Sequence, residues 1–369
     1  MTDWNQFKGD RANAGVRRDL DGPRRVEERW RVDLSGPIRS SPALDRDTVY
    51  VGTSVGNLFA LDRETGHRRW VFETFAAIDA APAVTDDSVY TGTADGTIRA
   101  LDPSTGELRW ETELPGDLTT SLSLADAGLD DERLFVGHAN GTSGTGLSAI
   151  DADTGEILWC HETDGEIAGC PAIDDERVYV GTDAETVLAV AIDTGDLEWE
   201  VPADGSITDG PTLADGLAYA GDDAGTLLAL DAETGQTWFT YGIDDVFTSS
   251  ATVLPEEETT FVGAADGYLH VTDTTFGRRK VRGWLFSKNG IALDGSVRSS
   301  PVVAGDICIA GDETGSLFGI DAAEFDLLWH FAVEGAVRST PAIAEERLYV
   351  GSDDERLYCL EWGPDEPIP

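Results

Sequence analysis

The sequence has little positive charge, and almost none of that charge is lysine. Seventy Asp and Glu residues stand against 26 Lys and Arg residues, for a formal net charge of −44. Lysine occurs only at Lys8, Lys280 and Lys288. Self-repulsion strains so acidic a fold at low ionic strength, whereas molar salt shortens the screening length to about 3 Å. We therefore expect a halophilic protein with an acidic surface and no nucleic-acid partner.

Long apolar runs are also absent from the sequence. The opening stretch MTDWNQFKGDRANAG holds no apolar segment of signal-peptide length, and no later run is long enough for a membrane-spanning helix. These two absences lead us to expect a cytoplasmic protein without membrane insertion. We also expect a monomer.

Cysteine and histidine are too few and too scattered to suggest a metal or catalytic centre. The four cysteines form no C-x-x-C pair and have no histidine at zinc-ligand spacing: Cys160, Cys170, Cys308 and Cys359. We interpret them as buried free thiols. No set of His, Ser and Asp can be assembled either, so we predict no catalytic residues and no metal site.

A short sequence motif recurs at regular spacing along most of the chain. IRSSPAL (38–44), VRSSPVV (297–303) and VRSTPAI (337–343) are three of eight related copies. Each copy precedes a β-rich run that ends in glycine, at Gly52, Gly92, Gly137, Gly181, Gly221, Gly263, Gly311 and Gly351. These glycines are 40 to 48 residues apart, which leaves room for four short strands in each unit.

A turn and an aromatic strand complete each unit. Asp62, Asp102, Asp151 and Asp231 each begin a turn that closes with glycine, and we interpret these aspartates as turn builders rather than acids of a catalytic site. The following strand carries a tryptophan, which we expect to pack between neighbouring sheets. The predicted set is Trp30, Trp70, Trp110, Trp159, Trp199, Trp238, Trp329 and, displaced, Trp284.

The two ends of the chain complement each other. The last unit stops after its third strand at LYCLEWG, while ERWRVDL (28–34) precedes the first unit. Pairing these segments would close a ring without long exposed edges. We predict an all-β, eight-bladed β-propeller of four-stranded antiparallel blades over 28–369, preceded by a basic extension over 1–27. We also expect residues 1–20 to be dispensable for stability.

The phrase at 50–70 and 90–110, YVG-T-xxGxLxALDxxTGxxxW, resembles the pyrroloquinoline-quinone (PQQ) repeat. The resemblance covers about 30–362 and implies either a scaffold, as in outer-membrane barrel assembly, or a quinoprotein dehydrogenase. The second possibility implies PQQ with calcium, a vicinal disulfide and a catalytic aspartate. This chain has no adjacent cysteines and no obvious calcium cluster, so we predict no cofactor and leave PQQ with calcium as the alternative.

Three copies of the phrase carry arginine after the leading apolar residue. Because blades seven, eight and one are consecutive in a closed ring, Arg298, Arg338 and Arg39 are predicted to meet at one mouth of the central channel. We predict that they bind an anion through charge-assisted, forked hydrogen bonds, unless Asp79 neutralises them. The hydroxyls that follow them complete the candidate site: Ser40, Ser299 and Ser339.

A second candidate site is the irregular stretch FGRRKVRGWLFSKNGIALD (276–294), which is rich in cations and aromatics. An irregular blade edge can receive a partner through an aromatic anchor, although an internally satisfied insertion is the alternative. The docking candidates are Trp284, Phe286, Arg279 and Lys280.

Together these features favour a non-enzymatic binding or scaffold propeller. Its partner would be a protein or a small anionic ligand at the channel mouth. The alternatives are a PQQ-dependent dehydrogenase and a ligand-sensing propeller that signals through a partner.

The charge balance generates the first prediction. The melting temperature should rise steeply as KCl increases from about 0.1 M to 1 M and above, because added salt screens the acidic surface. Differential scanning calorimetry across this range measures the effect, and a melting temperature independent of salt would contradict the halophilic interpretation.

Overall fold

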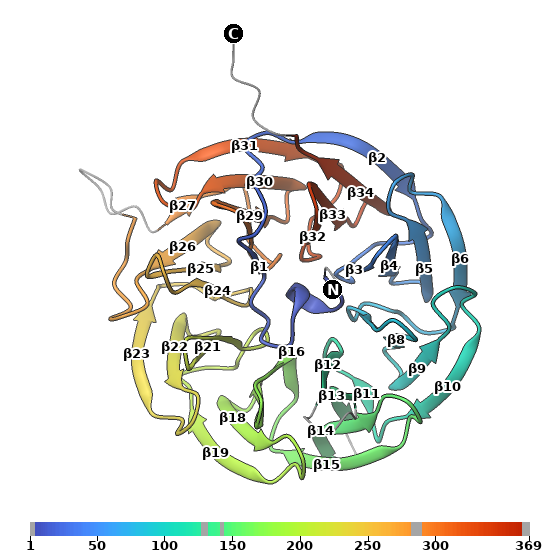
Figure 1. Ribbon diagram of the computed structural model, residues 1–369. Helices are drawn as coiled ribbons and strands as arrows, with labels where there is room; N and C mark the ends of the chain where they lie inside the picture. Colours follow the sequence, from blue (N-terminus) through green and yellow to red (C-terminus); the bar gives the residue numbers. More distant parts are fainter. Residues whose placement is uncertain (1–3, 127–131, 141–143, 282–289, 364–369) are drawn as a thin grey trace.

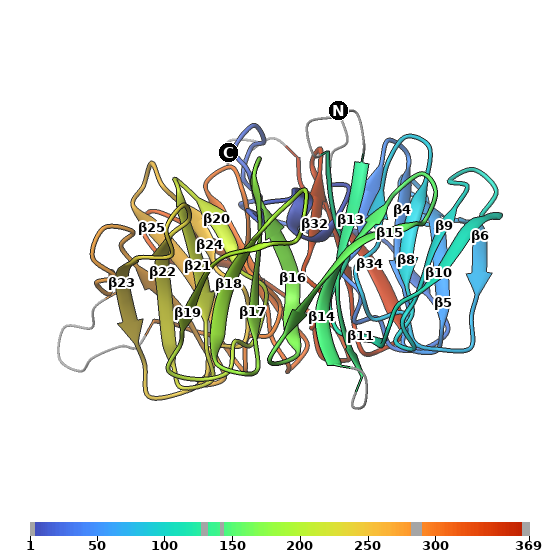
Figure 2. The ribbon, with the colours of Figure 1, turned by 90° about the horizontal axis from the view of Figure 1, so that it is seen from below.

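The computed structural model describes residues 4–126, 132–140, 144–281 and 290–363. Eight antiparallel sheets stand around a central axis, as Figure 1 shows in a view down that axis. The predicted eight-bladed propeller is thus confirmed. Figure 2 shows the same ring from the side, with the N-terminal segment inside its upper half.

Blades 1 to 4 follow one another along the chain, each running outward from an innermost strand. Blade 1 consists of β3 (Ala43–Asp45), β4 (Thr48–Gly52), β5 (Asn57–Asp62) and β6 (Arg68–Glu73). Blade 2 consists of β7 (Ala83–Val84), β8 (Val89–Gly92), β9 (Thr97–Leu101) and β10 (Leu108–Glu113). Blade 3 divides its innermost strand into β11 (Asp117–Leu118) and β12 (Ser123–Asp126), followed by β13 (Glu132–Asn140), β14 (Gly144–Asp151) and β15 (Ile157–Thr163). Blade 4 consists of β16 (Ile167–Ile173), β17 (Arg177–Thr182), β18 (Thr186–Ala191) and β19 (Leu197–Pro202).

Blades 5 to 7 repeat the pattern. Blade 5 consists of β20 (Thr212–Ala214), β21 (Leu217–Gly221), β22 (Thr226–Asp231) and β23 (Thr237–Gly242). Blade 6 consists of β24 (Thr252–Leu254), β25 (Thr259–Gly263), β26 (Tyr268–Thr272) and β27 (Ile291–Ala292). Blade 7 consists of β28 (Val302–Ala304), β29 (Ile307–Gly311), β30 (Ser316–Asp321) and β31 (Leu327–Ala332), with β1 (Val16–Arg17) added in parallel to β28.

Blade 8 joins the two ends of the chain. It consists of β32 (Ala342–Ala344), β33 (Arg347–Gly351), β34 (Arg356–Glu361) and, as its outermost strand, β2 (Glu27–Asp33). β2 pairs antiparallel with β34, with Trp30 opposite Cys359. The predicted closure by an N-terminal strand is therefore confirmed.

Aromatic packing between blades follows the sequence prediction with one correction. Tryptophans such as Trp70 and Trp199 are largely buried beside a tyrosine of their own blade, as in the pair Tyr50 and Trp70. Trp238 does not belong to this set, because 60% of it is exposed and Phe239 packs against Tyr219 in its place. Trp284 lies outside the described residues.

The N-terminal segment threads across the central channel. Its backbone carbonyls accept hydrogen bonds from the innermost strands of blades 1, 2, 4, 5 and 7: Trp4 from Leu44 (2.8 Å), Asn5 from Val84 (2.8 Å), Arg11 from Ile173 (2.7 Å), Ala12 from Leu213 (2.9 Å) and Gly15 from Val303 (2.8 Å). Between these contacts lies the 3₁₀ helix η1 (Phe7–Gly9), which packs beside β32. No helix within the described ranges is long and apolar enough to cross a membrane.

Side chains of this segment reinforce the contact with the blades. The Gln6 amide exchanges hydrogen bonds with the backbone of Leu124, at 3.1 and 2.7 Å, and the Asn13 amide donates to carbonyls of blades 4 and 5. Further along, Arg18 forms an ion pair with Glu257 of blade 6. These contacts argue against the expectation that residues 1–20 are dispensable, because without them the bonded backbone groups around the ring lose these partners.

Trp4 provides the test of this inner segment. Its indole is 1% exposed, so Trp4→Ala should lower the free energy of unfolding by roughly 3–5 kcal/mol. Urea unfolding at fixed KCl measures the loss. Trp238→Ala serves as the matched control and should cost under about 1 kcal/mol, because its indole is mostly exposed. Equal losses in the two variants would contradict a structural role for the segment.

Candidate binding site at the arginine mouth of the channel

Arg298, Arg338 and Arg39 meet as the sequence predicted. Each stands just before the innermost strand of its blade, and the three blades are neighbours because β2 closes the ring. The N-terminal segment contacts the opposite, C-terminal ends of the innermost strands. The arginines therefore surround the end of the channel that lies away from this segment, which we call the arginine mouth.

Two carboxylates link the three guanidinium groups into a ladder. Glu313 lies 2.8 Å from Arg298 Nε and 3.0 Å from Arg338 Nη1. Asp353 lies 3.1 Å from Nε of both Arg338 and Arg39. Each acid therefore bridges two neighbouring blades.

These two acids were not identified from the sequence. Asp79 is the counter-charge that the sequence offered, but its carboxylate accepts a hydrogen bond from the Ser54 hydroxyl. A signal was available, because Glu313 and Asp353 each stand two residues after the glycine that ends the second strand of their blade.

The ladder leaves donors exposed at the arginine mouth. It contains three guanidinium groups and two carboxylates, so its own charges sum to one positive charge. The side chains of Arg39 and Arg298 are 48% and 50% exposed, and the shortest contact of each with its carboxylate is through Nε. Their terminal nitrogens are available to an incoming acceptor.

The three serines of the candidate site are buried behind the arginines. The hydroxyl of Ser40 donates to the carbonyl of Ala80, that of Ser299 to Ser339, and that of Ser339 to Gly351, over 2.8–3.0 Å. All three serines are fully buried. Their hydroxyls join backbone segments within and between neighbouring blades, which leaves the arginines as the groups that a ligand can reach.

The second candidate site is described only in part. Trp284 and Phe286 lie outside the described residues. Arg279 donates from Nε to the Tyr241 hydroxyl at 3.1 Å. Lys280 donates to the carbonyl of Glu257 and the hydroxyl of Thr259, at 2.8 and 2.6 Å. Both cations are thus held against their own blade.

Inside the channel, the N-terminal segment places an amine near two acids, which sequence reasoning missed. Lys8 is 1% exposed and donates to the Ser250 hydroxyl and the Ala251 carbonyl. Burial lowers the pKa of its ammonium group to about 7, against the opposing pull of Asp209 and Asp10. Burial also raises the pKa of both carboxyl groups. The sequence does not show this cluster, because Lys8 and Asp10 lie in the N-terminal segment whereas Asp209 precedes β20 of blade 5.

The described residues do not match the quinone site that the resemblance implied. Cys170 lies in β16 of blade 4 and Cys308 in β29 of blade 7, and the chain has no vicinal pair. No group of three His, Cys, Asp or Glu residues within the described ranges is arranged to hold a metal ion. Three of the cysteines are buried as expected, whereas Cys160 is exposed.

Comparison with known proteins agrees with the repeat and the closed ring. A family model described as outer membrane protein assembly factor BamB matches residues 23–144, 118–208 and 282–363. Because these matches cover well over half of the chain, the chain belongs to this family of PQQ-repeat propellers. No curated protein sequence matches it significantly.

Solved structures with similar folds fall into functionally different groups. BamB from Moraxella catarrhalis has 21% identity and a TM-score of 0.74, covering 93% of this chain and 100% of its own. The quinohemoprotein alcohol dehydrogenase from Comamonas testosteroni has 15% identity and a TM-score of 0.79, covering 100% and 82%. A computationally designed protein, Ika8, has 20% identity and a TM-score of 0.76, covering 91% and 100%. At these identities the likeness shows the fold alone.

The buried amine generates a prediction on pH. Below pH 7, Lys8 carries its proton in both the folded and the unfolded chain, so the penalty of burying the charge is fully present. Between pH 7 and about 10 only the unfolded chain holds that proton, so stability rises with pH. From pH 7 to 8.5 the parent should gain about 1–2 kcal/mol relative to Lys8→Met.

Urea unfolding at the two pH values, at constant KCl, measures this difference. The range ends at 8.5 because above it the cysteines of the unfolded chain ionise, which Cys170 and Cys308 resist in the fold since burial raises the pKa of their thiols. Equal pH dependence in the parent and Lys8→Met would contradict a neutral amine in the channel.

Proposed function

We propose that the protein is a non-enzymatic binding or scaffold propeller that receives a carboxylate or phosphate group at the arginine mouth. The observation that carries this proposal is the half-exposed pair Arg39 and Arg298, whose ladder contacts through Nε leave their terminal nitrogens accessible. The family model is described by the name of an assembly factor, which supports a scaffold role. The occupant is an acidic side chain of a protein partner or a small anion, because both offer the same oxygens.

The ladder prepares the arginines for such an occupant. Arg338 forms ion pairs with both Glu313 and Asp353. The acids that bind Arg298 and Arg39 are therefore themselves held in place by Arg338. An arginine bound through Nε keeps its terminal N–H groups directed away from that contact, and two such groups can grip one carboxylate. Preorganisation of this kind lowers the ordering cost of binding.

Two other functions differ from this proposal in measurable ways. A quinoprotein would reduce a dye when supplied with PQQ and calcium, although the residues described above do not form the expected site. A sensing propeller would change its affinity for a partner on binding a small anion. The scaffold role requires neither behaviour.

The double variant Arg39→Gln/Arg298→Gln tests the proposal while leaving Arg338 between its two acids. We expect the parent to bind citrate, phosphate or an Asp-rich peptide, and the variant to bind the same ligand at least tenfold more weakly. Isothermal titration calorimetry at constant ionic strength gives both affinities. Comparing the affinity for the Asp-rich peptide with that for citrate and phosphate shows whether the site prefers an acidic side chain or a small anion.

Arg46→Gln is the matched control, because Arg46 is 76% exposed near the end of the innermost strand that faces away from the arginine mouth. It should bind as the parent does, with an unchanged melting temperature. Equal affinity of the parent and the double variant for all three ligands would refute the proposed site. Dye reduction with PQQ and calcium would refute the non-enzymatic assignment.

A further inference from the structure

In the outermost strand of blade 5, the tryptophan stands one position earlier than in the other blades that have one. In blades 1, 2, 3, 4, 7 and 8 that strand contains a bulge, and the tryptophan directly after the bulged residue packs inward. In blade 5 the inward residue is Phe239, which pairs with Ala229 as Trp70 pairs with Ala60. Trp238 therefore occupies the bulged position, and it faces outward.

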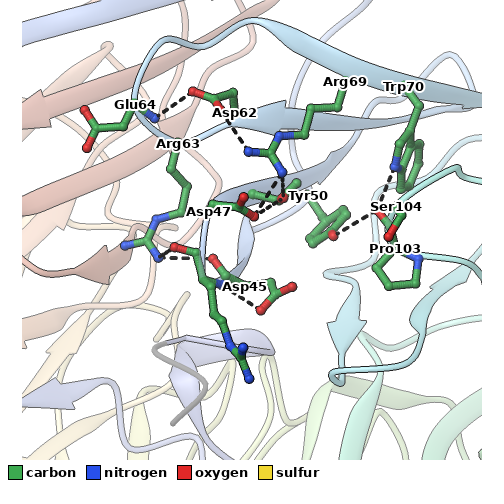
Figure 3. Close-up of polar contacts among 12 residues, drawn as sticks. Asp45, Asp47, Tyr50, Asp62, Arg63, Glu64, Arg69, Trp70, Pro103 and Ser104 are labelled. Atoms are coloured by element: carbon green, nitrogen blue, oxygen red, sulfur yellow. Dashed lines mark hydrogen bonds and ion pairs between the residues drawn. The ribbon is translucent and has the colours of Figure 1, made fainter.

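An arginine occupies this bulged position in three other blades. Figure 3 shows the arrangement in blade 1, where Arg69 lies 2.8 Å from Asp62 and 2.9 Å from Asp47, beside Tyr50. In blade 2, Arg109 lies 2.9 Å from Asp102, and in blade 8, Arg29 lies 2.5 Å from Glu361. A guanidinium group thus neutralises the carboxylate at the end of the third strand in each of these blades.

Blade 5 keeps the carboxylate but has lost the arginine. One oxygen of Asp231 accepts hydrogen bonds from Thr234, as the equivalent oxygen of Asp62 does from Thr65. The other oxygen, which in Asp62 faces Arg69, pairs with no cation among the described residues. This carboxylate is left without the counter-charge that Asp62, Asp102 and Glu361 have in blades 1, 2 and 8.

A cavity of about 420 Å³ lies at this place, between blades 5 and 6. Its walls include Asp215, Tyr219, Asp231, Trp238 and Glu258. Tyr219 is 1% exposed as a residue, and its hydroxyl has no hydrogen-bond partner within the described part of the chain. The equivalent hydroxyl of Tyr179 lies 2.6 Å from the Asp174 carboxylate and 3.0 Å from the Ala232 carbonyl. A tyrosine hydroxyl without a protein partner, three acids and an indole therefore line this space.

We propose that this cavity binds the side chain of an arginine from a protein partner, which replaces the arginine that blade 5 lacks. The guanidinium group would bind Asp231 as Arg69 binds Asp62, with the Tyr219 hydroxyl as a further acceptor. The indole of Trp238 offers the face over which a planar cation stacks. This site is separate from the arginine mouth and does not depend on the proposed function of that mouth.

A capped tripeptide with one arginine, acetyl-Gly-Arg-Gly-amide, is the probe. Its titration should shift the indole N–H resonance of Trp238, which is identified by its disappearance in Trp238→Phe. The experiment is run in 1 M KCl, so that general attraction to the acidic surface is screened. The citrulline analogue, which has the same shape without the charge, should bind at least tenfold more weakly.

Two variants isolate the groups responsible. Asp231→Asn keeps the oxygen that Thr234 needs but removes the charge, and it should weaken binding about tenfold. Asp151→Asn is the matched control, because Asp151 holds the same turn through Thr154 in blade 3, and it should bind as the parent does. Circular dichroism verifies that each variant is folded.

Trp238→Arg restores the arginine and should fill the cavity from within. We expect it to abolish binding of the tripeptide and to raise the melting temperature by about 1–2 °C. Equal binding of the arginine and citrulline peptides would overturn the proposal, and so would equal binding by Asp231→Asn and Asp151→Asn. Unchanged binding by Trp238→Arg would place the peptide elsewhere and overturn it as well.

Discussion

The contact on which the ring depends is an indole lying against a glycine of the next blade. Trp70 packs on Gly106 so closely that a Cβ there would lie 2.7 Å from the ring, and the glycine also has a φ of +72°. The indole N–H donates to the carbonyl of Pro103 in the same turn, at 2.8 Å. Trp30 repeats this contact against Gly66 and Arg63 across the closure of the ring. One residue pair therefore fixes both the spacing of the blades and the conformation of the turn.

This contact also determines where charged side chains face. Because the indole must reach the next blade, the strand bulges at the residue before it, and that residue turns toward the aspartate of its own turn. An arginine at the bulge then forms an ion pair, as Arg69 does with Asp62. With Trp238 at the bulge and Phe239 facing inward, blade 5 leaves uncovered a carboxylate that an arginine covers in blades 1, 2 and 8.

The sequence was sufficient to predict the blades, their number, the closure by β2 and the meeting of Arg39, Arg298 and Arg338, since each depends on a motif that recurs or on the order of the repeats. It was insufficient where a single copy departs from the motif by one position, as at Trp238. It also failed for the N-terminal segment, whose hydrogen bonds go to backbone groups of several blades and leave no periodic pattern. Glu313 and Asp353 are an intermediate case. Their position in the repeat can be recognised from the sequence, but their ion pairs depend on the arginines that lie opposite them.

The scarcity of cations makes their placement informative. A chain with 70 acids and 26 basic residues can neutralise only a minority of its carboxylates. In molar salt the field of a charge extends only about 3 Å, so recognition under that condition depends on direct contact. Direct contact requires fixed geometry, which the ladder gives to the guanidinium groups of the arginine mouth and the turn gives to Asp231. Both candidate sites are therefore places where the rigid ring holds a charge in position for one complementary group.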